Sequence, residues 1–257
     1  MGHPHKFIIF ALFSFLLLAF ALEVSAGEEQ KGKLFNLDIE GGPVWQSKND
    51  VRIPGNSGSE FSFKNLTGTG PYAAGRFTFD WDFGERHGLR LVAAPFRVEG
   101  TGTFSRPVSF AGETFASSIP TRGKYKFDTY RLGYRYQLYN KNAWTWKVGA
   151  TLLVRDADIQ LIQNGKEASK SNVGVVPLLH LAGQWSFAKD WQALLEFAGL
   201  AGGPGRALDL ALKIQYDLSD RWQISAGYRS LEGGVDTDEV YNFSWFHYAF
   251  FSAGYRF

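Results

Sequence analysis

The chain has 257 residues, no cysteine, 16% aromatic residues and a formal net charge of +2. This near balance of charge gives no reason to expect a nucleic acid as partner, because nucleic acids attract strongly basic surfaces. The lack of cysteine excludes disulfide bonds.

The amino-terminal segment has the organisation of a secretory signal peptide. Lys6 precedes an apolar run of 16 residues, FIIFALFSFLLLAFAL, and a small-residue cleavage site ending at Ala26 follows it. We therefore expect a signal peptide at 1–26 and a mature domain at 27–257. An uncleaved membrane anchor is the alternative, but the run is shorter than the roughly 20 residues that span a bilayer.

Nine connections divide the mature domain into stretches of alternating apolar and polar residues. Short polar connections lie at 84–88, 139–143, 188–190 and 219–221, and longer ones rich in Gly, Ser, Asn, Thr and Pro lie at 47–71, 98–124, 162–174, 201–206 and 232–242. The two kinds alternate along the chain, which predicts ten antiparallel strands. Eight strands are the alternative, if the 201–206 hairpin is miscounted or the first two segments do not both cross. After the signal peptide no apolar run is long enough for a transmembrane helix, so a membrane form would have to be a closed barrel.

Each predicted strand has one apolar and one polar face, with the period of two that a half-buried strand requires. A soluble sandwich would alternate as well, but its connections would not sort into two lengths. The tryptophans discriminate further, because six of the eight lie close to short connections: Trp81, Trp144, Trp146, Trp185, Trp191 and Trp222. Trp45 and Trp245 lie beside long connections. The tryptophans therefore predict aromatic girdles where a barrel wall meets the two membrane interfaces.

The last strand alternates in the same way, with Phe251, Tyr255 and Phe257 on one face. Together with the signal peptide and the ten segments, the closing AFFSAGYRF makes the chain resemble the bacterial outer-membrane β-barrel proteins. This resemblance implies an all-β fold, a transmembrane antiparallel up-and-down barrel in contact with the lipid of a Gram-negative outer membrane. It further implies that the barrel assembly machinery reads these three aromatic residues, with periplasmic chaperones as partners during biogenesis. It implies no particular activity, because barrels of this class host many functions.

The inward face of the predicted barrel is unusually charged. Ten tilted strands enclose a radius of about 10 Å, so long side chains from opposite walls can meet. We expect a lumen charge network of Arg76, Asp80, Arg131, Arg135, Lys147, Arg155, His180, Glu196, Asp209, Lys213 and Arg229. The basic residues of the second to fifth strands face acidic residues of the seventh and eighth, which would either join the walls or attract ions into a narrow pathway. Glu196, Asp209 and Arg229 lie on consecutive strands at similar depth, which also predicts a lateral contact among them.

Few residues suit catalysis. His87 lies in a short turn, His180 points inward, and His247 falls on the lipid-facing register near the outer rim. We expect His180 to be a hydrogen-bonded lumen residue, because no Ser or Asp is placed beside it. The omptin proteases also have ten strands, but their Asp-x-His pair has no match here, and the His-x-Ser of barrel lipid A deacylases is absent. A surface or lipid-modifying enzyme would therefore need Arg155, Asp156, Asp158 and His180 to converge.

Two further motifs have ordinary structural explanations. In VRDADIQL at 154–161, strict alternation would put Asp156 and Asp158 toward lipid, at a high cost. A bulge near Arg155, or an exit from the membrane before Asp156, would remove the conflict. We expect an ion pair there rather than a calcium site, since calcium takes six or more oxygens. GGPGR at 202–206 lacks the lysine and helix of a phosphate loop and predicts a tight turn.

These observations favour a barrel without catalysis, metal or cofactor, in a structural or narrow-channel role. The ligand is left open. A surface enzyme is one alternative, and an adhesin or receptor that uses the loops at 47–71 and 98–124 is another.

Overall fold

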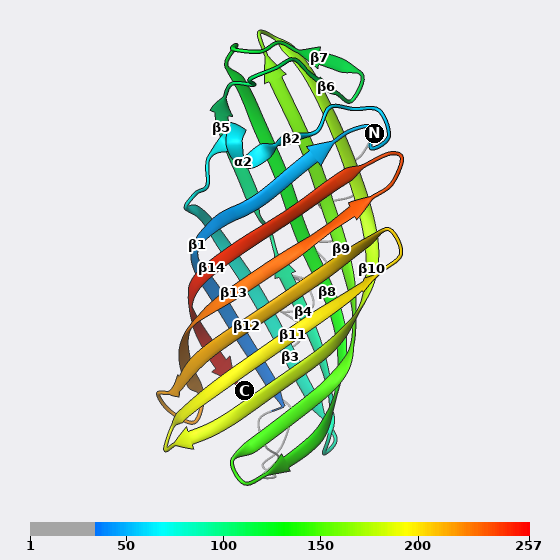
Figure 1. The fold of residues 1–257 in the computed structure, drawn as a ribbon. Helices are drawn as coiled ribbons and strands as arrows, with labels where there is room; N and C mark the ends of the chain where they lie inside the picture. Colours follow the sequence, from blue (N-terminus) through cyan, green and yellow to red (C-terminus); the bar gives the residue numbers. More distant parts are fainter. Residues whose placement is uncertain (1–33) are drawn as a thin grey trace, which may run out of the picture. The chain divides into compact units, whose positions relative to one another are not determined.

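The computed structural model describes residues 34–257, so the predicted signal peptide at 1–26 lies outside the described residues. Ten long strands form an antiparallel sheet that closes on itself (Figure 1). They are β1 (Phe35–Arg52), β3 (Tyr72–Phe83), β4 (His87–Ala94), β8 (Thr121–Lys141), β9 (Trp144–Gln163), β10 (Lys166–Ala188), β11 (Trp191–Gly202), β12 (Gly205–Asp217), β13 (Trp222–Asp236) and β14 (Tyr241–Arg256). Because β14 pairs with β1, the sheet closes into a barrel and its first and last strands are not edge strands. The predicted ten-stranded barrel is confirmed, and the eight-stranded alternative is wrong.

Shorter elements lie at the end of the barrel that carries the long connections. β5 (Arg97–Gly102) continues the line of β4 along β8, while β2 (Phe61–Ser62) pairs with β1 and is followed by the helix α2 (Phe63–Thr67). β6 (Val108–Phe110) and β7 (Glu113–Phe115) form a separate hairpin. Figure 1 shows all of them at the upper end, which we call the outer end.

None of the helices in the described part of the chain is long and apolar enough to cross a bilayer.

The predicted long connections at 162–174, 201–206 and 232–242 are mostly continuations of the barrel strands, so that part of the prediction is wrong. β9 and β10 continue to a tight turn at Asn164 and Gly165, whose φ angles of 49° and 78° suit an Asn-Gly hairpin. Likewise β11 and β12 run to Gly202 and Gly205, and β13 runs to Asp236. The reason is that a strand solvated above the membrane has polar residues on its outer face, and its composition then resembles that of a loop.

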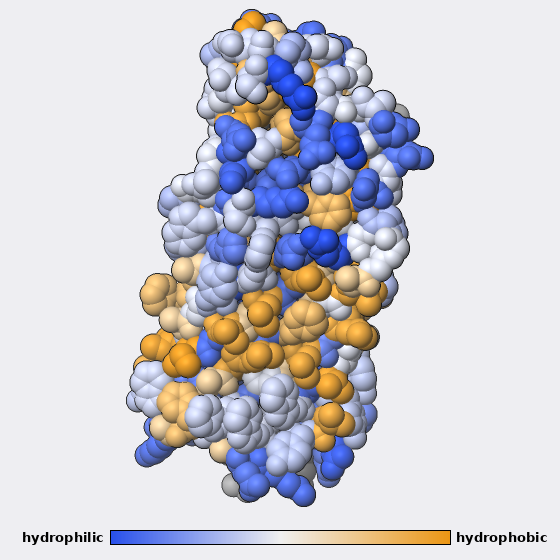
Figure 2. Space-filling model, viewed as in Figure 1, coloured by the Kyte–Doolittle hydropathy of each residue, from blue (hydrophilic) through white to orange (hydrophobic). Residues whose placement is uncertain are grey.

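The outward face of the lower half of the barrel is apolar. Figure 2 shows a band of hydrophobic residues there, with a mostly hydrophilic surface beyond it toward the outer end. Leu132, Leu152 and Leu212 are each at least half exposed on this wall. Near the short turns Trp144 stacks on Trp185 with ring centroids 5.4 Å apart. An exposed apolar band edged by aromatic residues is the lipid-facing surface of a transmembrane barrel.

The interior of the outer half holds a hydrophobic core rather than an open loop region. Phe61 of β2 contacts Phe104 and Phe110 edge to face, and Phe63 of α2 packs on Tyr125 of β8. We call this aromatic cluster the outer cap. Its buried residues are Val44, Val51, Ile53, Phe61, Phe63, Leu66, Phe96, Val98, Phe104, Val108, Phe110, Phe115, Tyr125, Ile159, Leu161, Ala168 and Phe246. The predicted loops at 47–71 and 98–124 therefore direct their large apolar residues into the mouth of the barrel.

Candidate functional site

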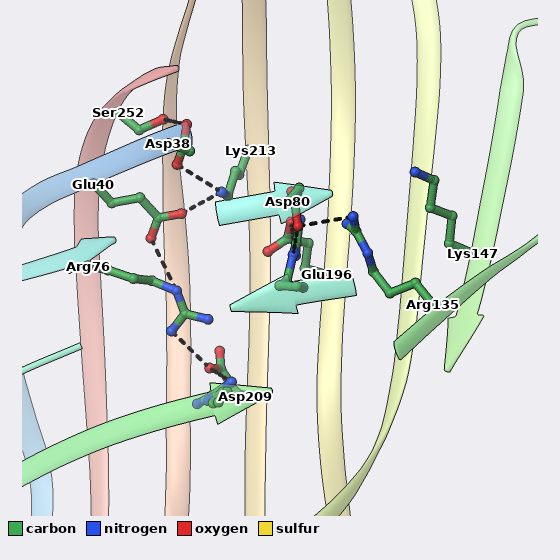
Figure 3. A network of polar contacts seen from close by, with 12 residues as sticks. Asp38, Glu40, Arg76, Asp80, Arg135, Lys147, Glu196, Asp209, Lys213 and Ser252 are labelled. Carbon is green, nitrogen blue, oxygen red and sulfur yellow. Dashed lines mark hydrogen bonds and ion pairs between the residues drawn. The ribbon is translucent and has the colours of Figure 1, made fainter. Parts of the chain in front are cut away.

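The centre of the lumen is occupied by Asp209, which lies on β12 and is buried. Its carboxylate accepts a hydrogen bond from Arg229 of β13 at 2.8 Å and forms an ion pair of 2.7 Å with Arg131 of β8. Arg76 of β3 approaches the same carboxylate to 3.6 Å (Figure 3). One acidic side chain thus joins three arginines from three other strands.

A second carboxylate extends this layer toward β1. Glu40 accepts a hydrogen bond of 3.0 Å from Arg229, forms an ion pair with Lys213, and lies 4.0 Å from Arg76. Lys213 also lies 3.9 Å from Asp38 (Figure 3). The layer contains several charges of each sign, which is the condition for burying ionic groups without leaving one unpaired.

A third set of contacts lies closer to the short turns. Arg90 of β4 holds Asp80 of β3 with two hydrogen bonds of 2.7 and 2.8 Å and reaches across the lumen to Glu196 of β11 at 2.8 Å. Arg135 lies 3.0 Å from Asp80. Lys147 donates to Asp82 at 3.1 Å.

The ion pairs of the lumen run between opposite walls of the barrel. Basic residues of β3, β4 and β8 pair with acidic residues of β11 and β12, so the opposite charges join the two walls. The predicted lateral contact exists between Asp209 and Arg229, but Glu196 pairs with Arg90 on the far wall. The prediction failed for Glu196 because sequence spacing gives the depth of a residue and not the direction of its side chain.

His180 points into the lumen as predicted, but its expected hydrogen bond is absent among the described residues. Its Nε2 atom is buried without a hydrogen-bond partner. A cavity of about 20 Å³ lies beside it, lined also by Arg90, Glu196 and Asp209. Such a volume accepts about one water molecule and no organic substrate.

Arg155 and the two aspartates beside it do not form the predicted catalytic alternative. Arg155 points inward opposite Gly174, whereas His180 lies opposite Gly149, six residues further along β10. At about 3.3 Å per residue, the backbone positions that carry these two side chains are roughly 20 Å apart along the barrel wall. Asp156 is on the outer wall, where it pairs with Lys126 at 2.5 Å. The centre of Arg155, Asp156, Asp158 and His180 is therefore ruled out by geometry.

Asp156 and Asp158 face outward, but they do so above the apolar band and therefore do not face the lipid interior. β9 pairs with β8 and β10 without a register shift over this stretch, so a bulge near Arg155 is wrong. Lys126 and the ion pair of Asp128 with Arg97 lie on neighbouring strands. This belt of charge shows that the strands have left the apolar band at this level. Among residues 34–257, no group of three or more His, Cys, Asp or Glu side chains is placed to hold a metal ion.

The three aromatic residues of the last strand lie on the outer wall. Phe251 is 75% exposed, Tyr255 contacts Trp222 with ring centroids 4.8 Å apart, and Phe257 packs on Phe35. Their role in assembly remains a prediction.

A polar cluster on the outer wall could not be found from the sequence. The hydroxyl of Ser47 lies 2.9 Å from Nε2 of His247, whose Nδ1 lies 2.6 Å from the hydroxyl of Tyr228. Only the pairing of β1 with β14, which closes the barrel, brings Ser47 to His247. At the opposite rim His87 contacts Tyr134 at the same 2.6 Å. Because the His–Tyr contact recurs at both rims, we interpret both pairs as hydrogen bonds of the interfacial aromatic girdles.

Comparison with known proteins supports the fold. No protein-family model and no curated protein matches the chain. Among solved structures, the outer membrane protease OmpT from Escherichia coli matches with a TM-score of 0.61 and 9% identity over 90% of this chain and 99% of that one. The translocator domain of the autotransporter NalP from Neisseria meningitidis matches at 0.43, with 13% identity over 96% of each chain. Ail of Yersinia pestis matches at 0.38, with 14% identity over 87% of this chain and 99% of that one.

The closed antiparallel wall, the exposed apolar band and the likeness to the OmpT fold agree. The ten antiparallel strands close into a barrel whose pairing lies within the wall, as a lipid-facing sheet requires. The chain folds as a ten-stranded antiparallel β-barrel with an exposed apolar band, a fold that it shares with the outer membrane protease OmpT.

Proposed function

We propose that this protein is a closed, non-conducting barrel with a structural role in the outer membrane, rather than a porin. The observation that carries the proposal is the binding of Asp209 by Arg76, Arg131 and Arg229, which connects four strands across the middle of the lumen. A solute path through this layer would have to separate buried ion pairs, and removing one partner of such a pair typically costs about 3 to 5 kcal/mol.

The outer cap is a second barrier in series with the charged layer. Phe63, Phe110 and Phe115 are fully buried within it, so close-packed aromatic side chains fill the mouth of the barrel. On the side of the short turns, by contrast, a polar cavity of about 350 Å³ is lined by Asp82, Lys147 and Arg256 among others. Along the barrel axis the outer cap closes the end opposite this cavity, which supports a closed barrel over the narrow-channel alternative.

The cap also weighs against the adhesin or receptor alternative. The apolar residues of 47–71 and 98–124 that would form a hydrophobic contact surface, such as Phe61 and Phe104, are turned inward. We propose no protein partner for these loops.

Conductance measurement tests the proposal directly. The refolded protein, reconstituted in planar bilayers, is expected to give no discrete openings at either polarity. Stable, ion-selective openings of the wild-type protein would refute the closed-barrel proposal and favour a channel lined by Arg76, Arg131 and Arg155.

A further inference from the structure

The barrel wall is incomplete between β10 and β11 on the outer side. Hydrogen-bonded pairing of the two strands begins at Leu179 and Gly199, and from Lys166 to Leu178 β10 pairs with β9 alone. The β9–β10 hairpin continues beyond the turn that joins β11 to β12 (Figure 1). Pro177 lies on the unpaired stretch and has no backbone N–H, which leaves one fewer donor unsatisfied there. We call this gap the lateral notch.

A cavity of about 290 Å³ lies behind the notch, separate from the small polar cavity at His180. Leu153, Leu178 and Ala198 form a buried apolar cluster that is one of its walls. Leu200 occupies an inward register position between Ala198 and Gly202, yet 41% of its surface is exposed because it faces the cavity. The volume is at the small end of the range, from about 300 Å³ upward, of pockets that bind small molecules.

One cation in this cavity has no counterion. Arg155 lines it, and its Nε atom is buried without a hydrogen-bond partner. Within residues 34–257, Arg155 makes no ion pair, whereas Arg131 at the floor of the cavity pairs with Asp209 and Arg206 at its mouth donates to Glu232 at 2.9 Å. A half-buried guanidinium without a partner is unfavourable, and an anionic ligand would supply the missing contact.

The approach to the notch is apolar. Val173, Val175 and Leu179 are each 63 to 65% exposed on the outward face of β10. The outward ion pairs of Arg206 with Glu232 and of Lys126 with Asp156 mark the upper limit of the apolar band on the neighbouring strands. The notch therefore opens where acyl chains meet headgroups, so its ligand would arrive from the outer leaflet.

We propose that the cavity binds a single-chain amphipathic carboxylate, of the fatty acid class, that enters from the outer leaflet through the lateral notch. The carboxylate pairs with Arg155 and the chain lies along Leu178, Ala198 and Leu200. One unpaired cation matches one anionic group, and the volume admits one chain but not a lipid with several. This site does not depend on whether the lumen conducts.

The chain offers a direct test because it has no native cysteine. Val175→Cys, at the edge of the notch, is labelled with an environment-sensitive fluorophore in a neutral detergent, and Leu212→Cys on the apolar band is the matched control site. Titration with dodecanoate is expected to change the fluorescence of the label at Val175→Cys in a saturable way. At Leu212→Cys the fluorescence should change only as far as dodecanoate alters the detergent micelle. Dodecanol, which has the same chain without the charge, is expected to bind more weakly.

Two substitutions measure separately what the charge and the apolar cavity contribute to binding. Arg155→Gln is expected to weaken dodecanoate binding roughly 10- to 100-fold, the range for a charge-assisted contact, and to leave dodecanol unchanged. Arg122→Gln, an exposed arginine paired with Glu99, removes the same charge outside the cavity and is expected to change neither. Leu200→Trp is expected to abolish binding of both by filling the cavity, and heat-modifiable gel mobility confirms that each variant is folded.

Three results would overturn the proposal. The first is an equal response to dodecanoate and dodecanol that Arg155→Gln does not change, which would show a site without anion recognition. The second is an absence of saturable binding at Val175→Cys. The third is displacement of dodecanoate by two-chain phosphatidylglycerol at equal concentration, which would show that the notch takes membrane phospholipid instead. If Arg155→Gln does not fold, Arg155→Lys provides the comparison, because a lysine keeps the charge and should retain the preference for dodecanoate.

Discussion

The carboxylate of Asp209 on β12 and the guanidinium of Arg229 on β13 are joined at 2.8 Å, and Arg229 also donates to Glu40 on β1 at 3.0 Å. Arg229 therefore connects two acidic residues that lie on strands separated by β13 and β14 in the closed sheet. Each of these carboxylates has further cations, whereas Arg131 pairs with Asp209 alone among the described residues. The layer is a cross-link of the barrel wall as well as an obstacle in its lumen.

Asp209→Ala is expected to lower the free energy of unfolding by about 3 to 5 kcal/mol, because it leaves Arg131 and Arg229 buried with fewer anionic partners. Urea-induced unfolding in lipid vesicles, followed by tryptophan fluorescence, measures the change. Glu113→Ala removes an exposed carboxylate paired with Lys166 at 3.3 Å and should cost no more than about 1 kcal/mol. Equal stabilities of the two variants would show that the lumen layer is solvated and does not hold the wall together.

Opening of the lumen is expected to require removal of both barriers. Asp209→Ala alone should stay closed in planar bilayers, because the outer cap remains. Replacement of 56–67 by a short glycine-serine linker removes Phe61, Phe63 and Leu66 from the cap but leaves the charged layer. The combination of both changes should give discrete currents. Openings in the Asp209→Ala variant alone would mean that the cap is permeable to ions.

Gly123 on β8 is expected to tolerate no side chain. A Cβ atom there would lie 2.8 Å from both Leu66 and Phe63 in the outer cap, so Gly123→Ala should destabilise the protein by about 1 to 3 kcal/mol through overpacking. Gly174 on β10 is the matched control, because a Cβ atom there would meet its nearest neighbours at an ordinary 3.6 Å. Thermal unfolding midpoints compare the two. A loss of stability in Gly174→Ala as large as that in Gly123→Ala would show that the strand glycines matter for the backbone and not for cap packing.

The number of strands and the sides they present could be predicted because a half-buried strand imposes a period of two on the sequence. The inward positions of Arg76, Arg131 and Asp209 followed from that period alone. The outer cap could not be predicted, because Phe61, Phe104 and Phe110 lie in stretches whose Gly, Ser and Pro content is typical of loops. Their contact depends on how these segments fold back into the mouth, and no local pattern records this.

The lateral notch was missed for a related reason. The turn of a hairpin fixes the register between its two strands. How far one hairpin extends beyond the neighbouring hairpin is not fixed by either turn. The polar segment at 162–174 has the composition of a loop, so the excess height of β9 and β10 over β11 could not be recognised. Arg155 could be placed on the inward face from the sequence, but no sequence pattern shows that it has no counterion there.

The carboxyl group of Asp158 predicts how the stability of the protein depends on pH. It lies on the outer wall beyond the apolar band, and its partial burial raises the pKa of its carboxyl above the ordinary value of 3.8, with the Lys126 charge acting in the opposite direction. A carboxyl whose pKa is higher in the folded state than in the unfolded state destabilises the fold when both states are ionised. The penalty is full above the folded-state pKa and disappears as the pH falls to the unfolded value. Asp158→Asn should therefore raise the thermal unfolding midpoint at pH 7, and the difference from wild type should shrink as the pH approaches 3.8.

Asp156→Asn is the control for this comparison, since Asp156 pairs with Lys126 at 2.5 Å and its neutralisation should lower the midpoint at pH 7. The two substituted positions are two residues apart on the same face of β9. If the unfolding midpoint at pH 7 rises in one variant and falls in the other, the effect of burial is distinguished from the effect of ion pairing. A lower midpoint for Asp158→Asn at pH 7 would contradict the prediction, because it would mean that attraction to Lys126 outweighs the cost of partial burial at that position.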